Sequence, residues 1–138
     1  MYGTILVTLE GTPTDRAIIE HVKELARLAG SRVVLLHVAD GWAARTYGSD
    51  AVSPEIGEDT AYLAGVRAEF EAAGIAAETE LAFGDPATEI VHWVEQKGCD
   101  LVAMSTHGHR FVKDMFLGNT VSQVRHSVDV PVLLLRAK

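Results

Sequence analysis

Short apolar runs alternate with stretches of helical periodicity along this chain of 138 residues. The runs TILVTL (residues 4–9) and RVVLLHV (residues 32–38) lack a polar face, which is typical of strands buried on both sides. After the first run, apolar residues recur at steps of three and four, the period of one helical face. Strands that alternate with helices predict a parallel sheet covered by helices.

Repeated along the chain, this pattern predicts five strands and four helices. The strands cover residues 4–9, 32–38, 76–83, 100–105 and 130–136, and the helices cover residues 15–29, 58–73, 86–97 and 120–127. Residues 39–57 and 106–117 are predicted to be loops, and Asp85 is predicted to cap the helix that Pro86 opens. The expected fold class is α/β, with an open, doubly wound parallel sheet of five strands and helices on both faces. One domain is expected to span residues 1–138.

Doubly wound sheets bind ligands beyond the carboxyl ends of their strands, where the winding direction switches. Two such ends carry Gly, Thr and Ser, in LEGT (residues 9–12) and STHG (residues 105–108). Gly118 and Asn119 then precede Thr120, which has the capping-box spacing to Gln123. A glycine before a helix start exposes backbone N–H groups to an anion. The spacing alone is compatible with a phosphate site and with an ordinary capped helix.

Charge and cysteine content narrow the classes of partner. The formal net charge of −7 disfavours broad electrostatic binding to nucleic acid or to anionic membranes. No apolar run approaches the roughly 18 residues of a membrane helix, and the N-terminus has no basic region or cleavage site typical of a secretory signal. The single cysteine, Cys99, excludes an internal disulfide and is expected to be structural. We therefore expect a cytoplasmic protein.

The segment MSTHGHRFVKDMFLGNTVSQVRHSVDVPVLLL resembles the universal stress protein family, and the resemblance covers nearly the whole chain. Nucleotide-binding members typically carry G-x-x-G, nine residues, and then G followed by Ser or Thr. This chain keeps the spacing but has Ser105 for the first glycine and Asn119 for the hydroxyl residue. Ser105 is harmful only where the backbone needs a positive φ. Asn119 retains an amide donor, and Thr120 could supply the hydroxyl, so retained nucleotide binding is favoured.

The resemblance implies a dimeric stress-response regulator or sensor that binds ATP or another adenine nucleotide with Mg²⁺ or Mn²⁺. It places adenine near Val38 and Met104, and the phosphates near the glycines and the start of the following helix. It also places an acidic residue after the first strand, here Glu10 where Asp is usual, beside the phosphates or their metal. The candidate binding residues are Thr8, Glu10, Val38, Met104, Thr106, Gly108, His109, Arg110, Gly118, Asn119 and Thr120.

Other side chains give weaker signals. Basic residues outnumber acidic ones between residues 105 and 126, which suits a polyphosphate. His107 and His109 form only a weak His-x-His metal signal, because a zinc site needs three or four ligands. His21 is expected to pack on the apolar face of its helix, and His37 to be a satisfied core residue. In the long loop, aromatic residues are expected to cover a ligand, a second subunit or the surface; these are Trp42 and Tyr47.

Two other functions remain open. The chain lacks the G-x-S-x-G and Walker motifs, so catalysis has little support. A slow ATPase or phosphate-ester hydrolase would use His107 and His109 beside Glu10. An interaction protein of the same family that binds no nucleotide would explain Ser105 and Asn119.

The last predicted strand is apolar from Val130 to Leu135 and is expected at the edge of the sheet. An exposed edge of this kind favours pairing with another strand, and Pro131 is tolerated only at an edge or a strand start. Universal stress proteins commonly dimerise through this strand, so the resemblance implies a homodimer with antiparallel pairing about a twofold axis. The alternative is a monomer whose edge is shielded by residues 39–57.

Overall fold

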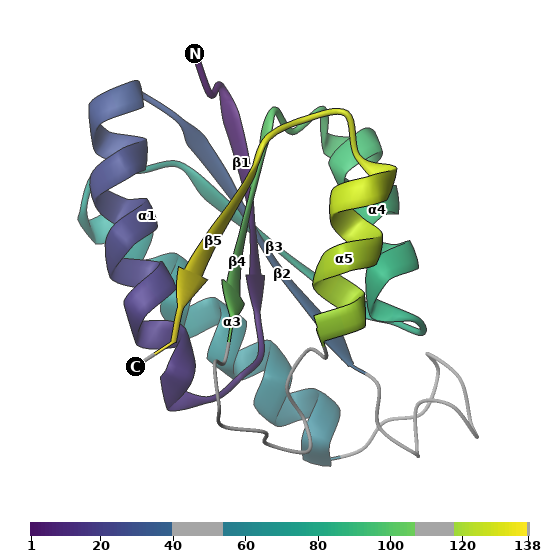
Figure 1. The fold of residues 1–138 in the computed structure, drawn as a ribbon. Coiled ribbons are helices and arrows are strands. Elements are labelled where there is room, and N and C mark those ends of the chain that lie inside the picture. Colours follow the sequence, from purple (N-terminus) through teal and green to yellow (C-terminus); the bar gives the residue numbers. More distant parts are fainter. Residues whose placement is uncertain (40–53, 107–117, 138) are drawn as a thin grey trace.

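The computed structural model describes residues 1–39, 54–106 and 118–137. Five parallel strands form one sheet in the order β3-β2-β1-β4-β5 (Figure 1), which confirms the expected doubly wound α/β fold. The strands are β1 (Thr4–Leu9), β2 (Arg32–Ala39), β3 (Ala77–Phe83), β4 (Leu101–Thr106) and β5 (Val132–Arg136). The helices are η1 (Pro13–Asp15, a short 3₁₀ helix), α1 (Arg16–Ala29), α3 (Pro54–Ala72), α4 (Pro86–Lys97) and α5 (Gly118–Ser127).

Helices cover both faces of the sheet: α1 and α3 lie on one face, and α4 and α5 on the other (Figure 1). Alternate residues of each strand point to opposite faces. In β1, Ile5, Val7 and Leu9 join the core beneath α1 and α3, whereas Leu6 joins the core beneath α4 and α5. Both faces are therefore apolar, which explains why the strand sequences lack a polar face.

The winding direction of the sheet switches between β1 and β4. From β1 the chain adds β2 and then β3 on one side, and it then crosses to place β4 and β5 on the other side. The carboxyl ends of β1 and β4 therefore lie next to each other while their connections leave in opposite directions. This is the position at which open α/β sheets bind ligands.

Three predicted element starts are wrong by two residues or more, and those of α1, β3 and β4 are wrong by one. Helix α3 begins at Pro54, inside the predicted loop of residues 39–57, because proline is well suited to a first helical turn. Helix α5 begins at Gly118, so Thr120 lies within its first turn and is not the N-cap of a capping box. Strand β5 begins at Val132. Pro131, which has no N–H to donate, precedes the strand, and its carbonyl accepts a hydrogen bond from the Val102 amide at 3.0 Å.

The two edges of the sheet differ in chemistry. At the β3 edge, Glu78 and Glu80 each lie 3.1 Å from Lys97 Nζ, and Glu78 also lies 3.5 Å from Arg32. At the β5 edge four of the five side chains are aliphatic, Leu134 is exposed, and the exposed Arg136 ends the strand. Charged side chains on an edge strand discourage pairing with another chain, so the two edges differ in their capacity to associate.

Two expectations about single residues have opposite outcomes. His21 is exposed on α1, so its predicted packing role is wrong; Ile18 and Val22 form the buried face of that helix. Cys99 is buried, and burial raises the pKa of its thiol to about 11, in agreement with the structural role expected for it.

Among the described residues, no helix is both long and apolar enough to cross a membrane.

The predicted cap of α4 is confirmed. The Asp85 carboxylate accepts hydrogen bonds from the Thr88 amide at 3.0 Å and from the Thr88 hydroxyl at 2.7 Å. The bond from the Thr88 hydroxyl, followed by the bond from its amide, lowers the pKa of Asp85. The cap therefore stabilises the fold most when Asp85 is ionised.

Replacing this cap with Asp85→Ala is expected to lower the free energy of unfolding by about 1 kcal/mol at pH 7. Because the pKa of Asp85 is lower in the folded protein, this charge contributes fully above the unfolded pKa of about 3.9. The contribution is lost as the pH falls through the folded pKa. Urea unfolding of the wild type and the variant at pH 7 and at lower pH measures the difference. Asp85→Asn keeps an acceptor without the charge and is the control; a loss in Asp85→Ala that is independent of pH would contradict the charged cap.

Candidate functional site

The candidate site lies at the carboxyl ends of β1, β2 and β4, beside the start of α5. Thr8 and Thr106 lie at the ends of β1 and β4, and Val38 lies near the end of β2. Glu10 follows β1 directly, and Gly118, Asn119 and Thr120 form the first turn of α5. The remaining candidate binding residues lie outside the described residues; they are Gly108, His109 and Arg110. The same holds for Trp42, Tyr47 and His107, whose signals in the sequence are weaker.

Two apolar side chains lie on the α4 and α5 side of these strand ends. Val38 and Met104 are both buried and belong to the core beneath α4 and α5. Thr8 pairs with Leu36 across β1 and β2, and it lies one step beyond the Val7–Ala103 pair of β1 and β4. It is 1% exposed, and its hydroxyl has no hydrogen-bond partner among the described residues. Apolar side chains with an unsatisfied hydroxyl nearby are suitable neighbours for a base.

Ser105 points to the other face of the sheet. It follows Met104 in β4 and pairs with Leu135 of β5, whose side chain packs on the core beneath α1 and α3. Among the described non-glycine residues only Tyr2 has a positive φ, so the Ser105 backbone does not need glycine. This departure from the family motif therefore introduces no backbone strain and adds no bulk beside Val38 and Met104, although the buried Ser105 hydroxyl has no hydrogen-bond partner among the described residues.

The turn between β1 and α1 is held by a buried carboxylate. Asp15, 1% exposed, accepts hydrogen bonds from the Glu10 amide at 3.0 Å and from the Gly11 amide at 2.9 Å. The sequence predicts Thr14 or Asp15 as a helix cap, but the Asp15 carboxylate turns back to the strand end and does not cap α1. An internal anion thus already occupies the two N–H groups of this turn, so a phosphate would need donors elsewhere.

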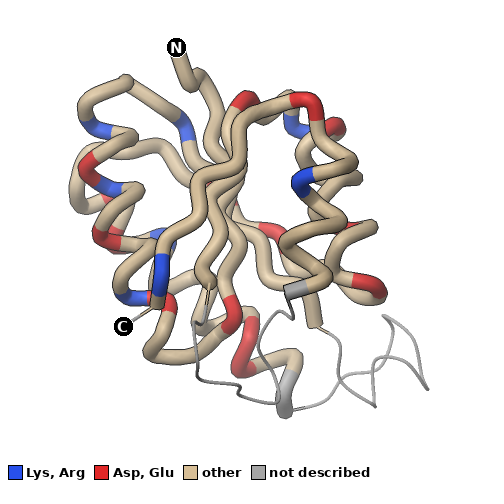
Figure 2. The backbone as a smooth tube through the Cα atoms, viewed as in Figure 1, with Lys and Arg blue, Asp and Glu red and all other residues tan. Residues whose placement is uncertain are grey.

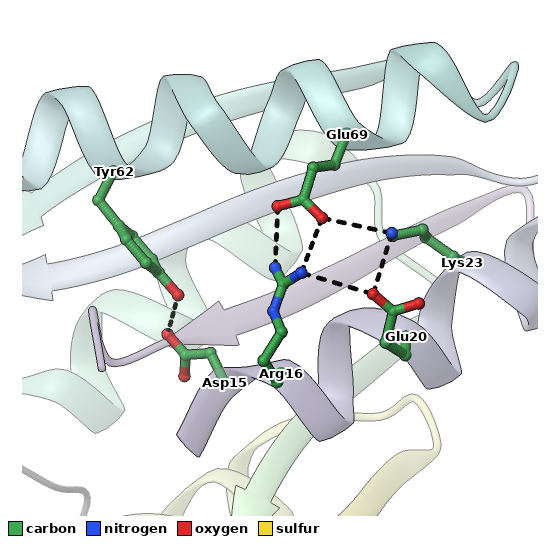
Figure 3. Close-up of polar contacts among 6 residues, drawn as sticks. All are labelled: Asp15, Arg16, Glu20, Lys23, Tyr62 and Glu69. Atoms are coloured by element: carbon green, nitrogen blue, oxygen red, sulfur yellow. Dashed lines mark hydrogen bonds and ion pairs between the residues drawn. The ribbon is translucent and has the colours of Figure 1, made fainter. Parts of the chain in front are cut away.

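Tyr62 of α3 makes a further hydrogen bond to the Asp15 carboxylate. Its hydroxyl donates to Asp15 Oδ2 at 2.6 Å (Figure 3). Burial, and then the hydrogen bond to Asp15, raise the pKa of Tyr62 well above its usual range, which keeps the phenol protonated as a donor. Beside this contact, Arg16 makes a two-pronged ion pair with Glu69, at 2.8 and 2.9 Å, and that pair ties α1 to α3.

His37 of β2 holds the backbone just before Glu10. Its Nδ1 donates to the Leu9 carbonyl oxygen at 2.7 Å, since a carbonyl can only accept. Its Nε2 lies 3.4 Å from Asp59 Oδ2 on α3. The expected hydrogen-bonded role of His37 agrees with this geometry, but its side chain is half-buried and not part of the core, and its partners lie at the edge of the candidate site.

Acidic residues gather where β1 ends and α3 begins (Figure 2). Glu10 is 7% exposed, and Glu58 and Asp59 lie in the first turns of α3. Within residues 1–39, 54–106 and 118–137, no group of three His, Cys, Asp or Glu residues could hold a metal ion alone. A cation at Glu10 would therefore need further oxygen ligands, which the phosphates of a nucleotide could supply.

Sequence reasoning missed the roles of Asp15, Asp59 and Tyr62. Asp15 lies four residues after Gly11, a spacing that is equally typical of a helix start. Tyr62 and Asp59 lie more than forty residues from the turn that they support, so no local pattern connects them to it.

Comparisons with known proteins identify the family and the fold of this chain. Residues 1–136 match the model of the universal stress protein family. Universal stress protein MJ0577 of Methanocaldococcus jannaschii is 26% identical over 157 residues, which cover 100% of this chain and 97% of that protein. A solved structure of MJ0577 has a TM-score of 0.82 and 27% identity, covering 100% of this chain and 98% of its own.

Two further solved structures contain nucleotides. A universal stress protein in complex with cAMP has a TM-score of 0.75 at 17% identity, covering 99% of this chain and 98% of its own. A universal stress protein from Archaeoglobus fulgidus in complex with dAMP has a TM-score of 0.72 at 20% identity, covering 96% of this chain and 97% of its own. At these identities the likeness establishes the shared fold.

Proposed function

Because the chain belongs to the universal stress protein family, we propose that it binds an adenine nucleotide, ATP in particular, at the carboxyl ends of β1, β2 and β4. The observation that carries the proposal is the unsatisfied, buried Thr8 hydroxyl near the apolar side chains of Val38 and Met104 at the switch point of the sheet. The complexes of two structural neighbours with cAMP and dAMP support an adenine base as the ligand.

The phosphates are proposed to bind at the start of α5. The first N–H groups of a helix lack partners within it and attract anions, and α5 begins at Gly118, with Asn119 and Thr120 in its first turn. The competing turn after β1 is already filled by Asp15, which favours α5 further. Thr106, Gly108, His109 and Arg110 remain proposed contacts from the preceding segment.

A divalent cation, Mg²⁺ or Mn²⁺, is proposed to accompany the nucleotide. The oxygen chemistry of Glu10 fits, since Mg²⁺ is commonly held by one or two carboxylates together with substrate phosphates. Glu10 lies among other acidic groups, which would repel uncompensated phosphates. The cation would neutralise phosphate charge there, and Glu10 would hold it.

The protein is further proposed to act as a dimeric regulator or sensor in the cytoplasm. The β5 edge supports the dimer: its outer side pairs with no strand of the described residues, and Leu134 is exposed there. Two copies of this edge can pair antiparallel about a twofold axis. The fold alone does not give a function, so the regulatory role rests on membership of the family.

Nucleotide binding is tested on the purified protein. We expect adenine nucleotide to copurify, seen by absorbance and mass spectrometry, and titration calorimetry to give saturable binding of ATP with Mg²⁺ well below millimolar concentration. GTP with Mg²⁺ is the control for the base, and adenosine for the phosphates. Absence of saturable ATP binding below millimolar concentration would reject the proposal and favour an interaction protein that binds no nucleotide.

A further inference from the structure

Two residues of α3 are connected to the backbone of residues 9–11, each through one other side chain. Asp59 and Tyr62 are three residues apart in the helix, so their side chains lie on the same face. One contacts His37 and the other contacts Asp15. Both intermediaries then bind main-chain atoms of residues 9–11, the segment that carries Glu10.

The path through Tyr62 holds the amides of the segment. Tyr62 donates to Asp15 Oδ2 at 2.6 Å, and the same carboxylate accepts from the Glu10 and Gly11 amides. Since Asp15 is a buried charge, each of these donors matters to it; a buried carboxylate is tolerated only when it is well hydrogen-bonded. Gly11 has a φ of 80°, which L side chains rarely adopt, so the turn that brings both amides to Asp15 depends on glycine at this position.

The path through Asp59 holds the carbonyl that precedes Glu10. His37 Nδ1 donates to the Leu9 carbonyl oxygen at 2.7 Å, and its Nε2 lies 3.4 Å from Asp59 Oδ2. The Asp59 carboxylate thus faces the second ring nitrogen, the placement of the outer carboxylates that orient histidines at metal sites. Glu10 is thus held on both sides, at the carbonyl before it and at its own amide.

We propose that Asp59 and Tyr62 are positioning residues of the nucleotide site, which act through His37 and Asp15 to aim the Glu10 carboxylate at the cation and phosphates. This inference rests on the proposed nucleotide binding. Coupling between sites is reciprocal, so bound Mg·ATP would in turn stabilise the first turns of α3. The stability of the first turns of α3 would then depend on whether the nucleotide is bound.

The test compares Tyr62→Phe and Asp59→Asn with the wild type. Each variant is expected to bind Mg·ATP about tenfold more weakly, the lower end of the ~10–100-fold loss seen when outer partners of metal ligands are removed. Adenosine affinity should not change, because adenosine makes no demand on Glu10. Asp59→Asn also distinguishes positioning from electrostatics. Removing a negative charge near the phosphates would by itself strengthen ATP binding, whereas loss of positioning weakens it. Weaker ATP binding by this variant therefore indicates positioning.

Glu69→Gln is the matched control. It removes another α1–α3 polar contact, the ion pair with Arg16, without touching residues 9–11, so Mg·ATP affinity should stay at the wild-type value. Amide hydrogen exchange adds a readout without ligand: the Glu10 and Gly11 amides should exchange faster in Tyr62→Phe than in Glu69→Gln. Unchanged Mg·ATP affinity in both α3 variants, or an equal loss for adenosine, would overturn the positioning role alone. Absence of nucleotide binding by the wild type would instead overturn the proposed function and this inference with it.

Discussion

Gly118→Val is expected to abolish ATP binding while the protein remains folded. Helix α5 begins at Gly118, where the backbone N–H groups are proposed to meet the phosphates. A branched side chain at this position would stand between those donors and the ligand, and phosphate oxygens need to approach the N–H groups to within about 3 Å. Titration calorimetry with ATP and Mg²⁺ is expected to show no saturable binding by the variant below millimolar concentration.

The control for this variant is Ser122→Val in the same helix. Ser122 is exposed and lies one turn further along α5. The Ser122→Val variant therefore adds the same branched side chain, but away from the helix start. Any effect of valine on helix propensity, which is a few tenths of a kcal/mol, appears in both variants. ATP affinity at the wild-type level in a folded Gly118→Val protein would refute the placement of the phosphates.

Leu134→Lys is expected to convert the proposed homodimer to a monomer. Leu133 and Leu135 pack on the core beneath α1 and α3, whereas Leu134 is 38% exposed at the β5 edge. The twofold axis uses each residue twice, and Leu134 is already more than half buried in the protomer, so completing the burial of two leucines contributes about 1–2 kcal/mol to the dimer. Loss of this contribution, together with the cost of bringing two lysine charges to the interface, weakens association by roughly 100-fold or more. Light scattering at micromolar concentration measures the mass.

Leu28→Lys is the matched control, because Leu28 is a leucine 88% exposed on α1, away from β5. This variant is expected to stay dimeric. Leu133→Lys, in contrast, should lower folding stability, because it places a charge against the core. A monomeric wild type at micromolar concentration would remove the dimer proposal altogether.

Sequence reasoning predicts the sheet well because its signal is local. A run such as TILVTL identifies β1 without knowledge of its neighbours, and the structure places the strand at Thr4–Leu9 as predicted. The open, doubly wound form of the sheet follows from crossover handedness, a general rule, whereas the strand order comes from the structure alone. Gly98 and Asp85 mark the ends of α4 for equally local reasons, a left-handed backbone and a side-chain cap.

The errors arise where a local pattern has two physical solutions. Asp15 has the composition of a helix cap, but the two amides of the preceding turn offer its carboxylate a buried and better-satisfied position. His21 follows the apolar spacing of α1, yet it lies just outside the arc that meets the sheet and is exposed. The support of Glu10 from α3 depends on contacts between distant segments, which only the folded chain brings together.

The unlike edges of the sheet limit how far the proposed association can proceed. The β3 edge carries two carboxylates paired with Lys97, whereas the β5 edge is aliphatic up to Arg136. A molecule with two edges open to pairing could add neighbours at both and grow into a fibre. A molecule with one such edge, used symmetrically, is complete after a single pairing. The charged β3 edge would thus limit the proposed assembly to two copies.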